Sequence, residues 1–135
     1  MSICVRARAG SADIDLSQTV LEISDSSTKN YMTYGNTLTD TDSINGDLFQ
    51  LSDYPSNGIQ FYLIVLEDAD GSCTQANPVI NSGDHVVLAI NTTAAFSKLQ
   101  ERTKVFGMVI PEEGSPGMIK FTTPAAYTKT VVELQ

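Results

Sequence analysis

The 135-residue sequence contains no tryptophan, one histidine and two cysteines. Without tryptophan it lacks the commonest aromatic platform for a sugar ring. His85 is predicted on the surface of a strand, and no GxSxG, P-loop or HExxH motif accompanies it. Cys4 and Cys73 are too few for a disulfide framework, form no zinc motif and leave their own pairing open. These absences predict that the protein is not an enzyme.

Long hydrophobic runs and positive charges are also scarce. The longest apolar run, residues 61–66, has six residues, whereas a membrane-spanning helix needs about 20. Eight basic against sixteen acidic residues give a net charge of −8, the wrong sign for binding phosphates or anionic lipids. The chain is therefore expected to insert into no membrane and to bind no nucleic acid. Its first residues show no secretory signal.

The charge is spread unevenly along the chain. Residues 1–97 hold three basic and twelve acidic residues, a net charge of −9, whereas residues 98–135 hold five basic and four acidic residues, a net charge of +1. One interpretation is a solvated acidic face. The other is a head-to-tail complementarity between copies in an assembly.

The dominant pattern is a series of short β-type segments separated by turn residues. Residues 12–16, 84–90 and 118–122 alternate between polar and apolar side chains, which predicts strands with one buried face. Residues 59–66 are apolar on both faces, so we expect a central core strand there. The length suits one domain, residues 1–135. These patterns predict an all-β fold, a β-sandwich of roughly seven to nine strands.

Only one short helix is expected. Residues 94–102 carry Phe96 and Leu99 at helical spacing, and Thr92 and Thr93 precede them as candidate caps. Residues 25–53 are rich in Ser, Thr, Asn and Asp and are predicted to carry long loops.

A candidate metal site lies in the segment 67–72. Asp68 and Asp70 follow a predicted strand, and Gly71 permits a sharp bend that turns several oxygens inward. A hard cation such as calcium prefers six to eight oxygen ligands, so further ligands would come from Asn77, Asn81 or elsewhere. The spacing is not that of an EF-hand loop, and an acidic turn without a metal remains the alternative.

One glycosylation sequon is present, Asn91-Thr92-Thr93 at the end of a predicted strand. Chance sequons are common, so the sequence leaves occupied and unoccupied Asn91 equally open, and the sequon matters only in an exported protein.

The C-terminal part resembles a known family. The run 105–127 and the ending Val131-Val132-Glu133-Leu134-Gln135 closely resemble the C-terminal end of archaellins, the archaeal flagellins. Residues 8–16 and 77–84 are similar to other typical stretches of that family. The resemblance covers most of the chain apart from about residues 25–60.

This resemblance implies a structural subunit of the archaellum, the rotating filament used in swimming motility, with an immunoglobulin-like β-sandwich displayed on the filament surface. Archaellins also carry a hydrophobic N-terminal helix that packs into the filament core. This chain opens almost directly on the globular domain. We therefore expect it to be monomeric by itself, with other archaellin subunits as partners through the absent helix.

The same resemblance implies an extracellular and N-glycosylated protein, which favours a glycan on Asn91. Some archaellins are similar in placing a metal in this acidic loop, which favours a divalent cation, calcium, at Asp68 and Asp70 with Asn77 as a further ligand. The alternative function is an extracellular adhesion or carbohydrate-binding β-sandwich module. Its ligand site would need exposed aromatic residues, for which the candidates are Tyr31, Tyr34, Phe49 and Tyr54.

Overall fold

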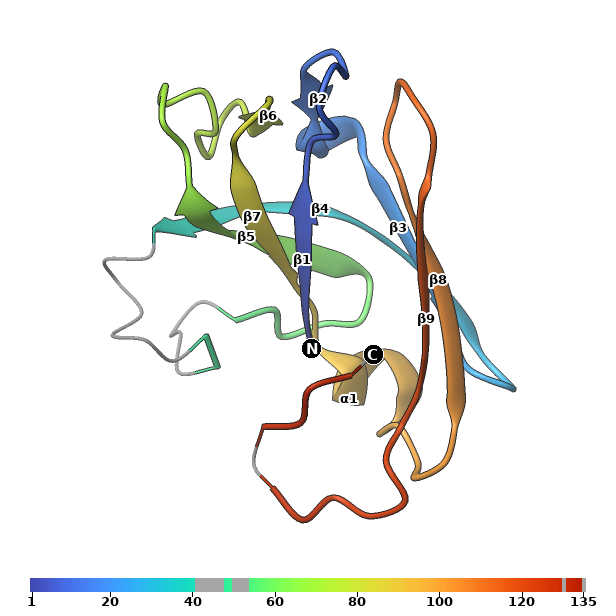
Figure 1. The fold of residues 1–135 in the computed structure, drawn as a ribbon. Helices are drawn as coiled ribbons and strands as arrows, with labels where there is room; N and C mark the ends of the chain where they lie inside the picture. Colours follow the sequence, from blue (N-terminus) through green and yellow to red (C-terminus); the bar gives the residue numbers. More distant parts are fainter. Residues whose placement is uncertain (41–47, 50–53, 130, 135) are drawn as a thin grey trace.

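In the computed structural model, which describes residues 1–40, 48–49, 54–129 and 131–134, seven strands form one curled sheet and two more form a short ribbon (Figure 1). The sheet strands are β1 (Ser2–Arg6), β3 (Val20–Ser24), β4 (Lys29–Asp40), β5 (Gln60–Glu67), β7 (His85–Ala89), β8 (Lys104–Ile110) and β9 (Gly117–Thr122). The ribbon pairs β2 (Ile14–Asp15) with β6 (Val79–Ile80). A 3-10 turn (Leu16–Gln18) and one short helix, α1 (Thr92–Phe96), complete the described elements.

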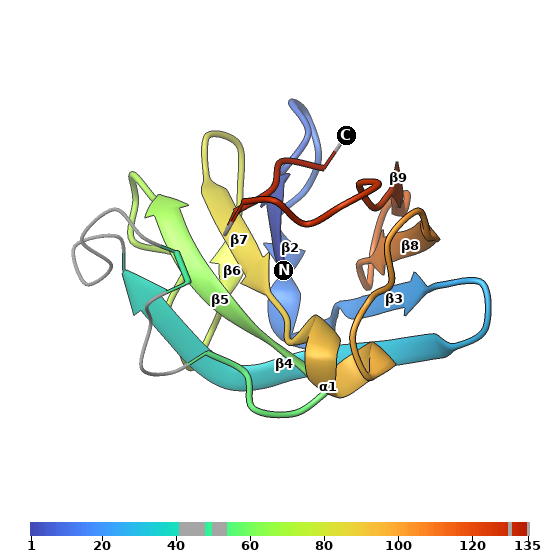
Figure 2. The same cartoon turned by 90° about the horizontal axis from the view of Figure 1, so that it is seen from below.

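The long strand β4 joins the two halves of the sheet. The strand order is β1-β7-β5-β4-β3-β8-β9, so β4 lies in the middle. Its first residues pair antiparallel with β3, and its later residues pair parallel with β5, with a register shift within that pairing between Tyr34 and Leu38. The sheet curls there, and its two halves face each other across the core (Figure 2). The predicted all-β sandwich is confirmed, with both layers belonging to one continuous sheet.

The core lies on the concave side of the curled sheet. Alternate side chains of β3, β5, β7 and β8 point into it, and Leu21, Ile23, Phe61, Leu63 and Val105 are fully buried. Because β5 and β7 are central strands, their other faces are also covered: Ile64, Val87 and Ala89 form a second small cluster. The core strand expected over residues 59–66 is present as β5, although Ile59 before it and Leu66 near its end are exposed. The prediction that 84–90 has only one buried face was wrong.

The segment from residue 25 onward contains the longest strand rather than only loops. The polar composition predicted loops here, and this prediction was wrong for residues 29–40, which form β4. Threonine and tyrosine have high β propensity, and both are frequent in this segment. Residues 41–47 and 50–53 of the expected loop region lie outside the described residues.

The helix is shorter than predicted and starts earlier. It covers Thr92–Phe96, and its N-cap is Asn91, whose side chain accepts a hydrogen bond from the Ala94 backbone. Ser97 and Lys98 both have positive φ angles, 53° and 89°, which end the helix before Leu99. In the described part of the chain, no helix is long and apolar enough to cross a membrane.

Candidate functional site

Three carboxylates converge where β5 and the β6–β7 turn meet. One oxygen each from Asp68, Asp70 and Asp84 lies within 4.8 Å of the others. Asp68 and Asp70 follow β5, and Asp84 directly precedes β7, which pairs with β5. The pairing of these two strands brings the two turns together. The structure thus unites both carboxylates that the sequence singled out.

Asp68 organises the turn that follows β5. Its Oδ1 accepts hydrogen bonds from the backbone N–H groups of Gly71 and Ser72, at 2.9 and 3.2 Å, and its Oδ2 accepts one from Cys73 at 3.1 Å. Gly71 has φ +72°, the left-handed conformation that a sharp bend needs. The bend predicted from the sequence is therefore present, and it folds the backbone around the Asp68 carboxylate.

Asp70 links the two turns through Asn81. The side-chain amide of Asn81 donates to Asp70 Oδ2 at 2.7 Å and to Ser72 Oγ at 3.2 Å. The Ser72 backbone N–H donates to Asp70 Oδ1 at 3.0 Å. Hydrogen bonds from Ser72 and then Asn81 stabilise the charged form and hold the pKa of Asp70 below its ordinary value. Asp70 is therefore ionised at neutral pH.

Asp84 is the buried member of the group, with 2% of its surface exposed. Its Oδ2 accepts a hydrogen bond from the Asn81 backbone N–H at 2.8 Å. The buried Cys73 lies close by: desolvation, followed by the charges of Asp68 and Asp84, raises the pKa of the Cys73 thiol to about 11. The thiol is thus protonated at neutral pH, so the available donors are oxygens, the ligands that calcium prefers.

The sequence missed Asp84 and favoured Asn77 in its place. Asn77 is exposed and closes a turn in which its backbone exchanges hydrogen bonds with Thr74, at 3.1 and 3.2 Å. Its role as a ligand stays a prediction. Asp84 becomes a neighbour of Asp68 only through the pairing of β5 with β7, which no local sequence signal indicates.

Asn91, the sequon asparagine, has both ends of its side chain engaged. Its Oδ1 accepts from the Ala94 N–H at 3.0 Å, and its Nδ2 donates to the Pro55 carbonyl at 3.0 Å. The side chain thus caps α1 and ties it to the residues before β5. One of the two Nδ2 hydrogens is used by Pro55, which leaves the other for a glycosidic bond.

The aromatic residues proposed for a ligand site do not gather. Tyr34 packs against buried Phe61, with ring centroids 6.1 Å apart, and Tyr54 against Phe49, at 6.3 Å. Tyr31 lies on the outer sheet surface.

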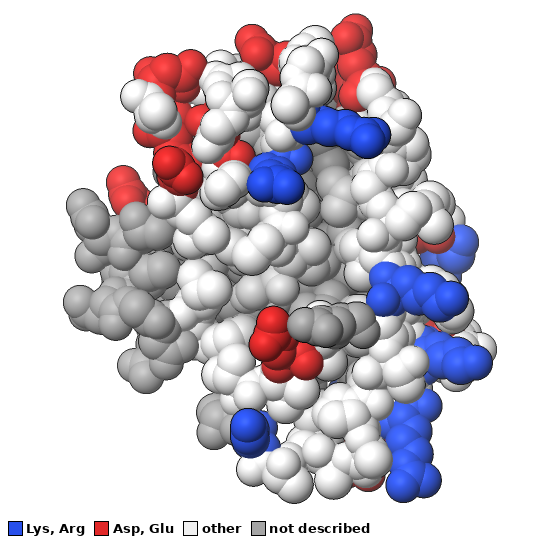
Figure 3. All heavy atoms as spheres, viewed as in Figure 1, with Lys and Arg blue, Asp and Glu red and all other residues white. Residues whose placement is uncertain are grey.

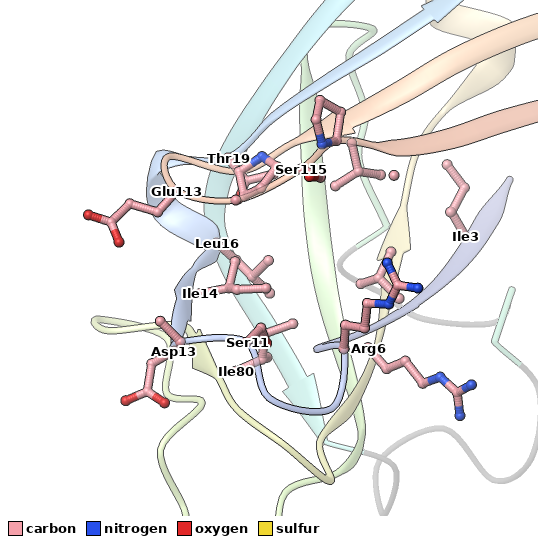
Figure 4. A pocket seen from close by; sticks show the side chains of 18 of the residues that line it. Ile3, Arg6, Ser11, Asp13, Ile14, Leu16, Thr19, Ile80, Glu113 and Ser115 are labelled. Atoms are coloured by element: carbon pink, nitrogen blue, oxygen red, sulfur yellow. The ribbon is translucent and has the colours of Figure 1, made fainter.

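A groove of about 620 Å³ lies elsewhere, between β1 and the β8–β9 hairpin (Figure 4). Ile3, Val5, Ile14 and Ile119 contribute to its lining, and the described lining residues include no aromatic side chain. A groove of this kind offers no stacking platform for a sugar ring.

The fold is a β-sandwich made of one curled sheet, and polar side chains tie its surface turns to each other. The family model described as archaeal-type flagellin matches residues 1–121. The chain therefore belongs to the archaeal-type flagellin family, a family of structural proteins, as the resemblance of its C-terminal part indicated.

Two relatives from Methanocaldococcus jannaschii match the entire chain. Flagellin B2 is 44% identical over 139 residues, and flagellin B1 is 39% identical over 140 residues. The chain spans 64% and 63% of the lengths of these relatives. The crystal structure of archaeal flagellin FlaB1 from the same organism superposes with a TM-score of 0.88 at 39% identity, covering 99% of this chain and 83% of that one. The fold is thus that of a flagellin domain.

Proposed function

We propose that this chain is the surface domain of an archaellum filament subunit that serves swimming motility outside the cell and has no enzymatic activity. The observation that carries the proposal is the agreement of sequence and fold: the entire chain aligns with flagellin B2, and its fold superposes on a flagellin at a TM-score of 0.88. No comparison supports the adhesion or carbohydrate-binding alternative, and the dispersed aromatic side chains argue against it.

Assembly is proposed to depend on an apolar N-terminal helix of the archaellin type, which would pack in the filament core. The described chain offers no such helix, and its buried apolar side chains are used in the core of the sandwich. By itself it is then monomeric at micromolar concentrations. In the filament, its partners are other archaellin subunits.

The experiment joins such a helix to the N-terminal side of the chain and follows assembly by electron microscopy and light scattering. Filaments from the joined protein, with the 135-residue chain remaining monomeric at about 50 μM, are the expected result; that concentration is far below the millimolar effective concentrations of tethered contacts. A joined protein with two charged residues in the helix is the control. Failure of the intact helix version to form filaments under any salt condition would overturn the proposal.

We further propose that the acidic group Asp68, Asp70 and Asp84 binds a divalent cation, calcium. Three carboxylates within 4.8 Å repel one another, and a divalent cation offsets that repulsion. Ser72 Oγ, backbone carbonyls and the predicted ligand Asn77 are candidates for the remaining positions. The cation would cross-link the turn after β5 to the turn before β7 and stiffen this part of the domain.

Calorimetric melting in calcium and in a chelator tests the cation proposal. The midpoint is expected to rise with calcium and to fall in chelator, because a ligand that binds only the folded state stabilises it. An unchanged midpoint would count against a bound cation.

A glycan on Asn91 is proposed as the modification of the native, exported protein. The free Nδ2 hydrogen and the position of Asn91 at a helix start on the molecular surface are compatible with it. Mass spectrometry of the protein isolated from its native cells tests this, and an unmodified peptide containing residues 91–93 would contradict it.

A further inference from the structure

Exposed acidic side chains outnumber basic ones at one end of the molecule, where Arg6 and Arg8 are also exposed. The β1–β2 loop, the β5–β6 loop and the β8–β9 hairpin lie together at the top of Figure 1, and acidic side chains gather over this end in Figure 3. Its exposed acidic residues outside the proposed cation group, which we call the acidic end, are Asp13, Glu67, Glu112 and Glu113. Exposed Leu66, adjoining this group at the end of β5, adds apolar surface.

A second surface has the opposite character. The outer face of strands β4, β3, β8 and β9 carries three lysines and several large apolar side chains that point away from the core. We call this the lysine face, and its exposed members are Lys29, Tyr31, Lys104, Phe106, Met118 and Lys120. Basic side chains accumulate along this side of the molecule in Figure 3.

Strand register places these side chains in rows across the sheet. Lys29 lies opposite Ser24, which lies opposite Phe106, which in turn lies opposite Lys120. In the next row, Tyr31 and Met118 lie on the two outer strands, with Glu22 and Met108 between them. The lysine face is thus a continuous mixed surface, since neighbouring rows of an antiparallel sheet are within side-chain reach.

The apolar side chains of the lysine face are unusually open. Met118 is 78% exposed, Tyr31 56% and Phe106 45%. The ammonium groups of Lys29 and Lys120 lie 5.8 and 5.7 Å from the ring centroids of Tyr31 and Phe106. Glu22 neutralises Lys29 at 2.8 Å, so the face keeps a positive balance from Lys104 and Lys120. Contiguous exposed apolar surface with a charged rim is typical of a protein interaction site.

We infer that the lysine face docks onto the acidic end of a second copy of this chain. This inference rests on the proposed filament function, and it specifies the two surfaces through which neighbouring subunits touch. Charge complementarity selects the partner: a chain of net charge −8 repels its copies except where its positive face meets carboxylates. Two different surfaces meet in this contact, so it is heterologous, and a heterologous contact that does not close into a ring repeats as a helical filament.

The isolated contact is weak, since it consists of exposed charges and a modest apolar patch. A filament core that tethers neighbouring domains provides effective concentrations in the millimolar range. The contact therefore forms in the filament while the free chain stays monomeric at micromolar concentration.

The test measures the mean mass of the 135-residue chain by small-angle X-ray scattering at protein concentrations from about 0.05 to 1 mM, which reach the effective concentration of tethered domains. We expect the mean mass to rise at low salt and to return to that of the monomer at about 0.5 M salt, where charges are screened beyond a few ångströms. The variant K104E/K120E should lose this rise. The matched control K98E/K129E carries the same change in net charge away from the lysine face and should keep the rise in mean mass at low salt.

A mixing experiment separates a head-to-tail contact from a symmetric one. The variants K104E/K120E and E112K/E113K each lack one of the two surfaces, so each is expected to be monomeric alone. Mixed one to one, they should form dimers and no larger species, because only one intact pair of surfaces is available. Melting midpoints equal to that of the unchanged chain verify that both variants are folded.

Several outcomes would overturn the inference. A chain that remains monomeric at 1 mM in low salt, a concentration typical of tethered contacts, has no such contact. Self-association of E112K/E113K alone would indicate a symmetric contact between lysine faces. Either result leaves filament formation by the helix-bearing protein unaffected, so the failure of this inference is distinguishable from failure of the proposed function.

Discussion

Asn81 donates its side-chain amide hydrogen bond to Asp70 over 2.7 Å and so connects two turns that are eleven residues apart in the sequence. Its backbone N–H donates to Asp84 at 2.8 Å. One residue thereby holds two of the three clustered carboxylates. The turn after β5 is consequently fixed to the turn before β7 even before any cation is considered.

The substitution Asn81→Ala tests this link through the pKa of Asp70. Hydrogen bonds from Ser72 and Asn81 lower that pKa from its ordinary value of 3.8. Loss of Asn81 should move it up towards 3.8, measured by NMR titration of the carboxyl carbon. The lowered pKa of Asp70 in the folded protein contributes stability above the unfolded pKa, and this contribution is lost as the pH falls through the folded pKa. The part of the Asn81→Ala destabilisation that comes from Asp70 should therefore vanish in acid. Asn77→Ala, in the neighbouring exposed turn, is the control and should leave the pKa unchanged.

The substitution Asp84→Asn separates charge from hydrogen bonding. An asparagine oxygen can still accept from the Asn81 N–H, while one of the three negative charges is removed. We expect the melting midpoint in chelator to stay near that of the unchanged chain, and the increase produced by calcium to fall substantially, because fewer charged ligands weaken calcium binding. Asp13→Asn, in an exposed loop, should retain the full calcium effect. A full calcium effect in Asp84→Asn would place the cation elsewhere.

Gly58 lies so close to the backbone of α1 that we expect no side chain to be tolerated at this position. A Cβ at Gly58 would lie 2.6 Å from Ala95 Cα and 2.7 Å from Ala95 N, both backbone atoms. Gly58→Ala should therefore lower the free energy of unfolding by about 1–3 kcal/mol, the usual range for overpacking. Chemical denaturation measures the change. Gly117→Ala, where the nearest atom would be 3.8 Å away, is the control and should have little effect.

Asn91 has two separable roles, as helix cap and as sequon. Asn91→Ala removes the cap and the bond to Pro55 and should cost about 1 kcal/mol of unfolding free energy in protein without a glycan. Asn91→Asp keeps an oxygen for the Ala94 N–H and should retain most of the capping contribution. Thr93→Ala keeps the cap and destroys the sequon. Equal stability of the Asn91→Ala chain and the unchanged chain would show that the cap contributes nothing.

Much of the fold was predictable because its strands differ in hydrophobic pattern. Residues 61–66 are apolar on both faces, and this pattern correctly indicated β5, in which Phe61 and Leu63–Val65 are buried. The alternation in 118–122 correctly placed Phe121 inside and Lys120 outside. In contrast, β4 is rich in Thr, Tyr and Asn, and its residues are mostly half-exposed. Polar strands resemble loops in composition, so only their pairing with neighbours reveals them.

Only part of the candidate site could be predicted, because its residues come from two segments of the sequence. Asp68, Asp70 and Gly71 are adjacent in the sequence, so their shared turn could be recognised locally. Asp84 reaches the same place only because β7 pairs antiparallel with β5, which a local pattern does not encode. The helix was misplaced by two residues at its start because Asn91, rather than a threonine, provides the cap.

Since β4 pairs with β3 through its first residues and with β5 through its later ones, neither half of the sandwich holds all of its backbone hydrogen bonds without the other. Opening one half frees part of the strand that completes the other half. Local opening thus spreads into global unfolding, and amide hydrogens on both sides of β4 should report one common free energy of opening, that of the whole domain.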